Sequence, residues 1–254
     1  MRPLVVGVLN ATPDSFHDGG AYDDLFSHGL RLVEEGADWL DIGGESTRPG
    51  AADVCEQEEM DRVCPLIEKL AGSCPISIDT SKPAVAAAAR SAGAEILNDV
   101  TGLRDPEMAR VSAGFQKTIV MHSRGTPRTM SGLNSYSDLI KEIRNELLKS
   151  AARARSPEVW VDPGIGFAKD ANQSLSLLKH GGAFTDLGYP LLIGASRKSF
   201  IGQSLGRPDT GDRLYGSLAA VSAGYQFGAR AFRVHDVQAT RDVVDLLFAI
   251  ENAE

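Results

Sequence analysis

Eight short apolar runs are spaced along this chain, and nearly every one ends in a polar or charged residue. A run of four to eight apolar residues, rich in β-branched side chains and bounded by Gly or Pro, is typical of a buried strand. Each run is followed by loop residues and then by a helix-like stretch, which predicts a (β/α)₈ TIM barrel. The runs end at Asn10, Asp41, Asp79, Asn98 with Asp99, His122, Asp162, Lys198 and His235.

The connections at the two ends of the predicted barrel differ in length. Turns that lead into strands are short, whereas loops that leave strands are long, notably 10–24 and 43–56. Active sites of such barrels lie at the carboxyl ends of the strands, so we expect function on the face with the long loops. Helices are expected over residues 25–35, 56–70, 83–91, 106–111, 137–154, 172–179, 212–227 and 236–250.

The chain length favours one barrel domain over residues 1–254, since such barrels typically contain about 250 residues. The first strand begins almost at Met1, so we expect a truncated N-terminus without a hairpin that caps the bottom of the barrel. Side chains from the strands or from neighbouring turns would then close the lower end.

The composition limits the partners and the compartment. A net charge of −8 argues against nucleic acid or an anionic membrane as a partner. No apolar stretch reaches the roughly 18 residues of a membrane span, and the N-terminus lacks a signal-peptide pattern. The cysteines form no CxxC pair, so reduced thiols are favoured over a disulfide or a zinc site. We therefore expect a cytoplasmic protein.

Asp79, Asn98 and Asp162 stand at the ends of three apolar strands. Carboxylates in such positions are costly unless they have partners. A structural role, such as capping the next helix, explains any one of them. Three that converge on one mouth favour recognition of a flat heterocycle, because a carboxylate accepts two parallel hydrogen bonds from an aminopyrimidinone edge.

Basic residues gather after three other strands. Arg48 lies in the loop GGESTRPG, and its guanidinium suits phosphate, although a loop arginine is usually only solvated. Lys198, Arg233 and His235 follow the last two strands, where barrels of this class often bind phosphate. His235 either donates to phosphate or orients a general base. The amide of Asn10 can hold a hard cation or a ligand hydroxyl, or it can start an Asx-type turn.

The segment DPGIGF, residues 162–167, carries two glycines after a strand. It does not match a dinucleotide-binding fingerprint, because Lys169 stands where the third glycine is required. We interpret it as a tight turn that exposes Asp162 and presents Phe167 as an apolar wall. No Ser-His-Asp or Cys-His arrangement is recognisable, so no protein nucleophile is expected.

Taken together, these segments resemble the dihydropteroate synthase family of folate biosynthesis. The resemblance covers nearly the whole chain and includes, in the family's order, NATPDSF, GADWLDIGGESTRPGA, SIDTSKP, ILNDVTG, MHSRGTPRTM, DPGIGF, GASRKSFIG and RVHD. It implies a (β/α)₈ barrel, usually a homodimer, that joins 6-hydroxymethyl-7,8-dihydropterin pyrophosphate to p-aminobenzoate and releases pyrophosphate and 7,8-dihydropteroate. It also implies Mg²⁺ as a cofactor and sulfonamides as competitors of p-aminobenzoate.

Carried over position by position, the resemblance implies three groups of site residues. The pterin would be held by Asp79, Asn98, Met121, Asp162 and Lys198. The pyrophosphate would be bound by Asn10, Arg48, Arg233 and His235, and Asn10 would also help to hold Mg²⁺. The p-aminobenzoate would be surrounded by Phe16, Thr47, Arg48, Pro49, Phe167, Lys198 and Ser199. Catalysis would rest on Asn10, Arg48, Lys198, Arg233 and His235.

Two strand ends have lesser expected roles: Asp41 a structural one, and His122 one below that of its neighbour Met121. The chain departs from the family's pattern at Ala11, where Val is common, at His17, which replaces a usual Ser, and at Ala168, where Gly is common. The added methyl of Ala168 would stiffen the turn near the p-aminobenzoate site.

Two other functions share part of this pattern. A corrinoid-linked methyltransferase has the same pterin-binding barrel, but it would not need STRPG, SRKS and RVHD. A catalytically silent pterin-binding paralogue would not need the cations that suit pyrophosphate. Both alternatives are therefore disfavoured by the same basic residues.

Overall fold

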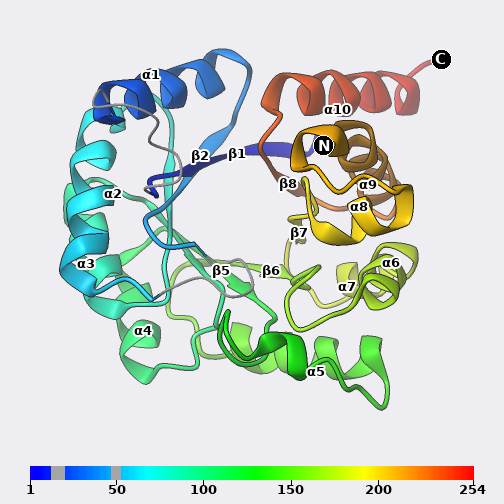
Figure 1. Cartoon of the computed structure of the whole chain (residues 1–254), viewed down its shortest axis with the longest axis horizontal. Helices are drawn as coiled ribbons and strands as arrows, with labels where there is room; N and C mark the ends of the chain where they lie inside the picture. Colours follow the sequence, from blue (N-terminus) through cyan, green and yellow to red (C-terminus); the bar gives the residue numbers. More distant parts are fainter. Residues whose placement is uncertain (13–20, 47–52) are drawn as a thin grey trace.

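Parallel strands form a closed (β/α)₈ barrel in the computed structural model, which describes residues 1–12, 21–46 and 53–254 (Figure 1). Within the eight-stranded sheet of this described part, the strand order is β6-β5-β4-β3-β2-β1-β8-β7. The ring closes where Val161 forms a parallel bridge with Leu191 and its amide donates to Pro190 O at 3.0 Å. The predicted TIM barrel is confirmed. The strands are β1 (Leu4–Asn10), β2 (Trp39–Gly43), β3 (Ile76–Asp79), β4 (Ile96–Asp99), β5 (Lys117–Met121), β6 (Glu158–Asp162), β7 (Leu192–Ile193) and β8 (Ala231–Val234).

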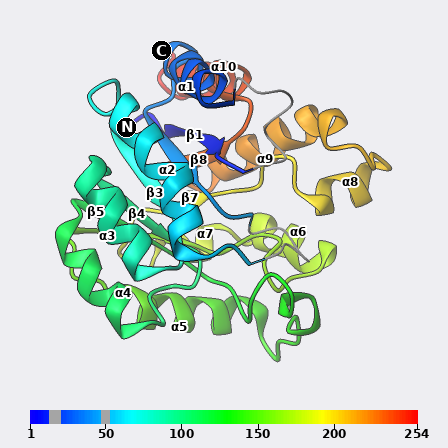
Figure 2. The same cartoon turned by 60° about the vertical axis from the view of Figure 1, so that its left-hand side comes forward.

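Helices surround the strands and cover the outer face of the barrel (Figures 1 and 2). Caps explain several boundaries: Asp138 accepts from Lys141 N before α5, and Asp170 and Gln173 form a capping box before α6. Gly93 ends α3 in the left-handed conformation at φ 118°. The helices are α1 (Ala21–Glu34), α2 (Glu56–Leu70), α3 (Pro83–Ala92), α4 (Pro106–Val111), α5 (Leu139–Ala151), α6 (Ala171–Lys179), α7 (Gly182–Thr185), α8 (Ser199–Leu205), α9 (Leu214–Gln226) and α10 (Val237–Glu251).

The seventh strand is much shorter than the sequence predicts. The run PLLIGASRK predicts a strand that ends at Lys198, but β7 contains only Leu192 and Ile193. The chain then leaves the sheet and turns, with Arg197 in the left-handed region at φ 56°, so that Lys198 becomes the residue before α8. Helices α7 and α8 were not predicted, because they are too short for a helical periodicity to be visible.

The register of the parallel strands determines the height at which each inward-facing side chain lies in the barrel. Side chains alternate between the two faces of a strand. The pairings align Asp79 with Asn98 and Met121 with Asp162. Asn98 is paired with Ile119, so Met121 and Asp162 lie two residues beyond Asp79 and Asn98 in register. All four stand at the carboxyl ends of β3 to β6 and form the upper part of the barrel interior.

An apolar cluster fills the interior below this level. Trp39 and Trp160 meet edge to face, with ring centroids 5.6 Å apart. Trp160 Nε1 donates to Glu158 Oε1 at 2.7 Å, and Lys117 pairs with Glu158 where β5 and β6 begin. Side chains of the strands thus close the lower end, as predicted. The remaining members of the cluster are Val6, Ile96, Ile119, Leu192 and Ala231.

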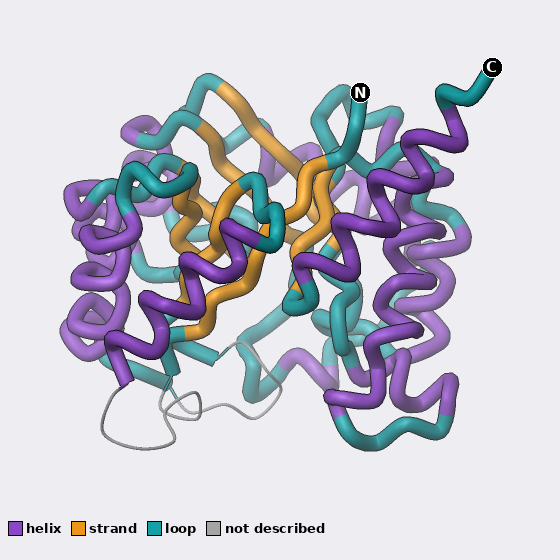
Figure 3. The backbone as a smooth tube through the Cα atoms, turned by 90° about the horizontal axis from the view of Figure 1, so that it is seen from above, coloured by secondary structure: helices purple, strands orange, loops and turns teal. Residues whose placement is uncertain are grey.

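Figure 3 shows the strands enclosed by the helices. A larger apolar core lies between these two layers. It includes the fully buried side chains of Leu40, Ile42, Ile78, Phe184 and Phe232. Within the described ranges, no helix has the length and the apolar character needed to cross a membrane.

Candidate active site

A buried cluster of charged side chains forms the floor of the barrel mouth. Arg233 of β8 donates through Nε to Asp41 Oδ2 at 2.5 Å and through Nη2 to Asp79 Oδ2 at 2.7 Å. Asn98 Nδ2 donates to Asp41 Oδ2 at 3.1 Å. Asp41 is 1% exposed and Asp79 is 9% exposed. The barrel thus brings Asp79, Asn98 and Arg233 together as expected for one mouth, and adds Asp41 to them.

Two buried oxygens of this floor have no hydrogen-bond partner in the part of the chain that the structure describes. They are Oδ1 of Asp41 and Oδ1 of Asp79. A buried acceptor without a donor costs about 1–3 kcal/mol, so such atoms usually mark a functional site. Each oxygen can accept a hydrogen bond from a ligand that carries N–H groups.

The charges of the floor depend on one another. Burial raises the pKa of the Asp79 carboxyl to about 7; Arg233 opposes this shift, while Asp41, Glu59 and Asp99 add to it. Burial lowers the pKa of Arg233, but Asp41 and Asp79 outweigh burial, so the pKa of Arg233 lies above its ordinary value. Arg233 therefore stays charged and holds the two carboxylates together.

Asp162 and Lys198 extend the floor toward a second region. Asp162 Oδ1 accepts from Gly164 N at 2.7 Å, and burial raises the pKa of Asp162 although Lys198 opposes the shift. Burial lowers the pKa of Lys198 to about 8, and Asp162 limits the decrease. Lys198 Nζ donates to Ile165 O and lies 4.5 Å from the centre of the Phe167 ring. The predicted pterin residues Asp162 and Lys198 thus meet the predicted apolar wall.

The turn that carries Asp162 and Phe167 requires special backbone conformations. Gly164 has φ 65°, and a Cβ atom there would lie 1.9 Å from His122 O, so only glycine fits. Ala168 is buried and adopts φ 48°, a left-handed conformation that favours glycine. This φ explains why glycine is common there in the family and why an alanine would restrict the turn. The interpretation of DPGIGF as a tight turn is confirmed.

Two further predicted residues border the mouth. Met121 is 4% exposed and is aligned with Asp162, so it belongs to the same level of the barrel interior. Ser199 is the exposed first residue of α8 and directly follows Lys198. Their roles beside the pterin and the p-aminobenzoate, respectively, stay predictions.

A cavity of about 440 Å³ opens at the ends of β1 and β8. It contains two of the predicted pyrophosphate residues, Asn10 and His235, whereas Arg233 points to the floor instead. Arg31 of α1 and Arg197 of the turn after β7 share this cavity with one carboxylate, Asp24, and Arg197 is paired with Asp236. The two guanidinium groups could serve an anion. The full lining is Val8, Leu9, Asn10, Asp24, Leu25, His28, Arg31, Arg197 and His235.

Ser196 orients the imidazole of His235. The backbone amide of His235 donates to Ser196 Oγ at 3.2 Å, and Ser196 Oγ lies 3.1 Å from His235 Nδ1. Since the serine oxygen already accepts from the amide, its own proton is available for Nδ1. In the tautomer that accepts this proton at Nδ1, Nε2–H is a donor; in the other tautomer Nδ1–H donates to the second lone pair of Ser196 Oγ.

Four predicted residues lie outside the described residues: Phe16, Thr47, Arg48 and Pro49. His17 lies outside them too. Charged side chains hold the described neighbours of the second loop: the half-buried Lys82 Nζ contacts Glu45 Oε2 at 2.7 Å and the buried Glu59 Oε2 at 2.5 Å.

A second cavity, of about 210 Å³, borders these neighbours and reaches Phe167. Its lining comes from the loops that follow β2, β3, β4, β5 and β6 and presents more apolar than polar surface. The lining residues are Glu45, Ser46, Asp53, Ser81, Lys82, Val100, Thr101, Ser123, Gly125, Thr126, Pro127, Met130 and Phe167.

Sequence reasoning missed Asp41 and Lys169. Asp41 was expected to have a structural role, and its contacts with Arg233 and Asn98 agree with one. Its buried Oδ1 atom, which has no partner among the described residues, was not anticipated. The alternation of side chains along β2 could have revealed it, because Trp39 and Asp41 share one face. Lys169 is only 8% exposed, and a lysine next to a glycine-rich turn gives no pattern that distinguishes a buried side chain from a solvated one.

The chain matches the model of the family described as pterin binding enzyme over residues 6–235. It is 43% identical over 261 residues to a dihydropteroate synthase of Synechocystis sp., a match that covers 98% of this chain and 90% of that protein. A Xanthomonas albilineans dihydropteroate synthase solved with 4-aminobenzoic acid has a TM-score of 0.93 at 41% identity, covering 100% of this chain and 94% of the other. The structure of a Xanthomonas albilineans dihydropteroate synthase in complex with 7,8-dihydropteroate gives a TM-score of 0.90 at 39% identity, covering 100% and 95%.

Proposed function

This chain belongs to the pterin-binding enzyme family, and we propose from its barrel mouth how it carries out the dihydropteroate synthase reaction. The enzyme is a transferase that condenses 6-hydroxymethyl-7,8-dihydropterin pyrophosphate with p-aminobenzoate. The bond between the pterin methylene carbon and the pyrophosphate oxygen breaks, and pyrophosphate keeps the electron pair. A bond from the arylamine nitrogen to the methylene carbon forms, and the arylamine loses a proton.

The observation that carries this proposal is the buried floor. Asp41, Asp79 and Asp162 present carboxylate oxygens, Asn98 presents an amide, and Lys198 presents an ammonium, all around one mouth. A pterin edge offers ring and amino N–H donors together with a carbonyl acceptor. The free oxygens of the floor would accept from the donors, and Lys198 would donate to an acceptor of the pterin.

Departure of pyrophosphate would be assisted by cations. Asn10 and His235 line the 440 Å³ cavity next to the floor, and its basic lining supports binding of a polyanion there. His235 Nε2–H would donate to a phosphate oxygen as negative charge develops. The roles of Arg48 and Arg233 toward pyrophosphate stay predictions, and Arg233 in this structure contacts carboxylates of the floor.

The residues present fit Mg²⁺ that arrives with the substrate. Within the described ranges, no group of three or more His, Cys, Asp or Glu side chains is arranged to hold a metal ion. Mg²⁺ commonly uses few protein ligands and is held mainly by water and substrate phosphates, and the Asn10 amide oxygen would supply one such ligand. When bound, the ion supplies charge neutralisation of the leaving pyrophosphate.

The second substrate would bind beside Phe167 and Lys198. Lys198 Nζ lies 4.5 Å from the centre of the Phe167 ring, which supports this proposal. The Phe167 ring would pack against the ring of p-aminobenzoate, and the Lys198 ammonium would attract the carboxylate or the amine lone pair of that substrate. Phe16, Thr47, Arg48, Pro49 and Ser199 are proposed to complete this region. Sulfonamides would compete there with p-aminobenzoate.

The decisive experiment incubates the protein with dihydropterin pyrophosphate, p-aminobenzoate and Mg²⁺ and follows dihydropteroate and pyrophosphate. Equal amounts of the two products are expected, together with loss of turnover when the metal is chelated. Pterin binding without product would instead identify a catalytically silent pterin-binding paralogue. Transfer of a methyl group from a methylated pterin would identify the methyltransferase.

We further propose that the enzyme acts in the cytoplasm as a homodimer. The acidic composition and the lack of CxxC pairs support the first proposal, and the resemblance to the family supports the second. Sedimentation equilibrium at micromolar concentration would give twice the mass of one chain, and the mass of a single chain would refute the dimer.

A further inference from the structure

A buried lysine lies beneath the turn that carries Asp162 and Phe167. Lys169 is 8% exposed, and its Nζ atom donates to Gly164 O at 2.9 Å and to Phe167 O at 2.8 Å. The same atom lies 2.9 Å from His122 Nδ1. Nζ also lies 3.5 Å from His122 O. Burial lowers the pKa of Lys169 well below its ordinary value, and Asp162 opposes the shift. The amino group donates to the two carbonyls with or without its third proton.

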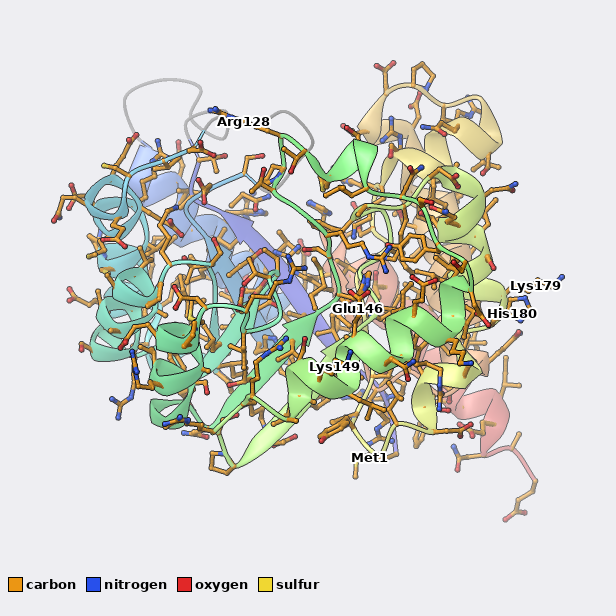
Figure 4. The ribbon with its side chains drawn as sticks, turned by 90° about the horizontal axis from the view of Figure 1, so that it is seen from below. Met1, Arg128, Glu146, Lys149, Lys179 and His180 are labelled. Atoms are coloured by element: carbon orange, nitrogen blue, oxygen red, sulfur yellow. The ribbon has the colours of Figure 1, made fainter. Side chains whose placement is uncertain are left out.

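His122 completes the contacts of this lysine. The ring is buried, and its Nε2 atom lies 3.0 Å from Glu146 Oε2 of α5, the helix that carries the labelled Glu146 in Figure 4. Burial, reinforced by Lys169 and Arg124, lowers the pKa of His122 to about 2. The imidazole is therefore neutral, and its Nδ1 atom is the ring nitrogen within hydrogen-bond distance of Lys169 Nζ. Among the described residues, Nε2 makes no hydrogen bond of good geometry despite its short distance to Glu146.

The same turn is also held from α5 and its preceding loop. Arg124 bonds Glu142 at 2.8 Å and Glu146 at 2.6 Å, and its guanidinium lies 4.0 Å from the ring centre of Tyr136. The Tyr136 hydroxyl donates to Ala168 O at 3.0 Å. These contacts tie the residue before Lys169 to a network that reaches the protein surface.

The contacts of Lys169 lead directly to the groups proposed to touch substrate. Gly164 uses its carbonyl toward Lys169 and its N–H toward Asp162 Oδ1 at 2.7 Å. Phe167 uses its carbonyl toward Lys169 and its N–H toward Gly164 O at 3.0 Å. On the opposite side of the turn, the Ile165 carbonyl accepts from Lys198. The turn is therefore held between two lysines, one buried and one at the mouth.

We propose that Lys169, supported by His122, is a positioning residue that sets the Asp162 carboxylate and the Phe167 ring for the two substrates. This role rests on the proposed function. Without the buried amino group, the carbonyls of Gly164 and Phe167 lose a donor inside the protein, and the turn relaxes toward whatever geometry satisfies them. A displacement of about 1 Å at such a group costs up to about 100-fold in rate or affinity.

The test compares Lys169→Met with Lys179→Met. Lys179 is the exposed last residue of α6 and points away from the molecule in Figure 4, so it is a matched control. Affinity for 6-hydroxymethylpterin is measured by calorimetry, and KM for p-aminobenzoate and kcat are measured separately. Lys169→Met is expected to weaken pterin binding by about tenfold to 100-fold and to raise KM for p-aminobenzoate. The control is expected to match the wild type in all three quantities.

A second pair of variants covers the case in which Lys169→Met does not fold. His122→Asn keeps an acceptor near the position of Nδ1, whereas His122→Leu has none. The proposal expects near-normal pterin affinity for the asparagine variant and a loss of at least about threefold for the leucine variant. Equal affinity in both variants would overturn the proposal, and so would a lower Tm of Lys169→Met with unchanged affinity.

Amide hydrogen exchange separates failure of this proposal from failure of the proposed function. Without any ligand, the amides of Gly164 and Phe167 are expected to exchange faster in Lys169→Met than in Lys179→Met. If the wild type does not form dihydropteroate, but these amides still lose protection, the function is wrong and the positioning of the turn stands. Unchanged protection would overturn the positioning role itself.

Discussion

Replacing Arg233 by leucine should make stability depend on pH in a range where the wild type does not. The guanidinium holds Asp41 at 2.5 Å and Asp79 at 2.7 Å, and both carboxyls are buried. Breaking a buried pair by removing one partner costs roughly 3–5 kcal/mol. Arg233→Leu leaves two buried carboxylates without their cation, so one of them is expected to take up a proton.

The direction of the pH effect follows from Asp79. Its pKa in the folded protein is raised to about 7, above the ordinary value for an unfolded chain, so the folded state binds more protons than the unfolded state below pH 7. Wild-type stability therefore falls as pH rises toward 7, and this contribution then flattens. Arg233 is the cation that opposes the shift, so in Arg233→Leu the pKa of Asp79 rises further and the decline continues above pH 7.

The size of the effect is that of one proton, about 1.4 kcal/mol per pH unit. Between pH 7 and pH 8.5 the variant should lose about 2 kcal/mol more than the wild type, equivalent to a Tm difference of about 4–8 °C for a chain of this size. Urea unfolding at four pH values between 6 and 8.5, followed by tryptophan fluorescence, gives the difference directly.

Arg110→Leu is the control, because Arg110 pairs with Glu107 on the surface, where both side chains are more than half exposed. Its free energy of unfolding should change with pH in the same way as that of the wild type. If the free energy of unfolding of Arg233→Leu changed with pH as that of the wild type does from pH 7 to 8.5, the pKa of Asp79 would not depend on Arg233.

Three further outcomes are expected. Asp162→Asn should weaken 6-hydroxymethylpterin binding by at least about 100-fold in calorimetry, because an amide cannot accept both hydrogen bonds and its buried N–H₂ opposes the ligand's donors; near-normal affinity would remove Asp162 from the pterin site. Gly164→Ala should lower Tm and pterin affinity together, because its Cβ would lie 1.9 Å from His122 O at φ 65°; a variant with wild-type affinity would show that the turn adapts. Trp160→Ala should cost about 3–5 kcal/mol in urea unfolding, because it removes half of the ring contact with Trp39 inside the barrel; a loss below about 1 kcal/mol would mean that the lower cluster is not a stabilising plug.

The fold could be predicted because its repeating unit has a local signature. Strands with continuous apolar runs and loops with Gly and Pro indicate a barrel without knowledge of any contact. The seventh strand was misjudged, since PLLIGASRK is apolar up to Ala195 although the chain leaves the sheet after Ile193. Apolar composition indicates that a segment is buried, but not that it belongs to a sheet. Residues 194 and 195 are buried outside the sheet.

The candidate site could be predicted only where a residue follows a strand directly. Asp79, Asn98 and Asp162 were found in this way, and the barrel brings them to one mouth. Lys169 was not predicted. Its contacts are with the backbone carbonyls of Gly164 and Phe167 and with the ring of His122, and such contacts leave no pattern in the sequence. His122 was ranked below Met121 for the same reason: its contacts with Lys169 and Glu146 exist only once α5 packs against the barrel.

The cluster around Trp39 and Trp160 has a kinetic consequence for the groups above it. Its buried members are at most 5% exposed, so apolar side chains fill the space below Asp41 and Asp79. Proton exchange between these carboxyls and solvent must therefore pass through the same opening that the substrates use. Once a pterin covers that opening, the protonation state present at binding should persist for the lifetime of the complex. The pH of the solution would then govern which complexes form, rather than what happens inside one that has already formed.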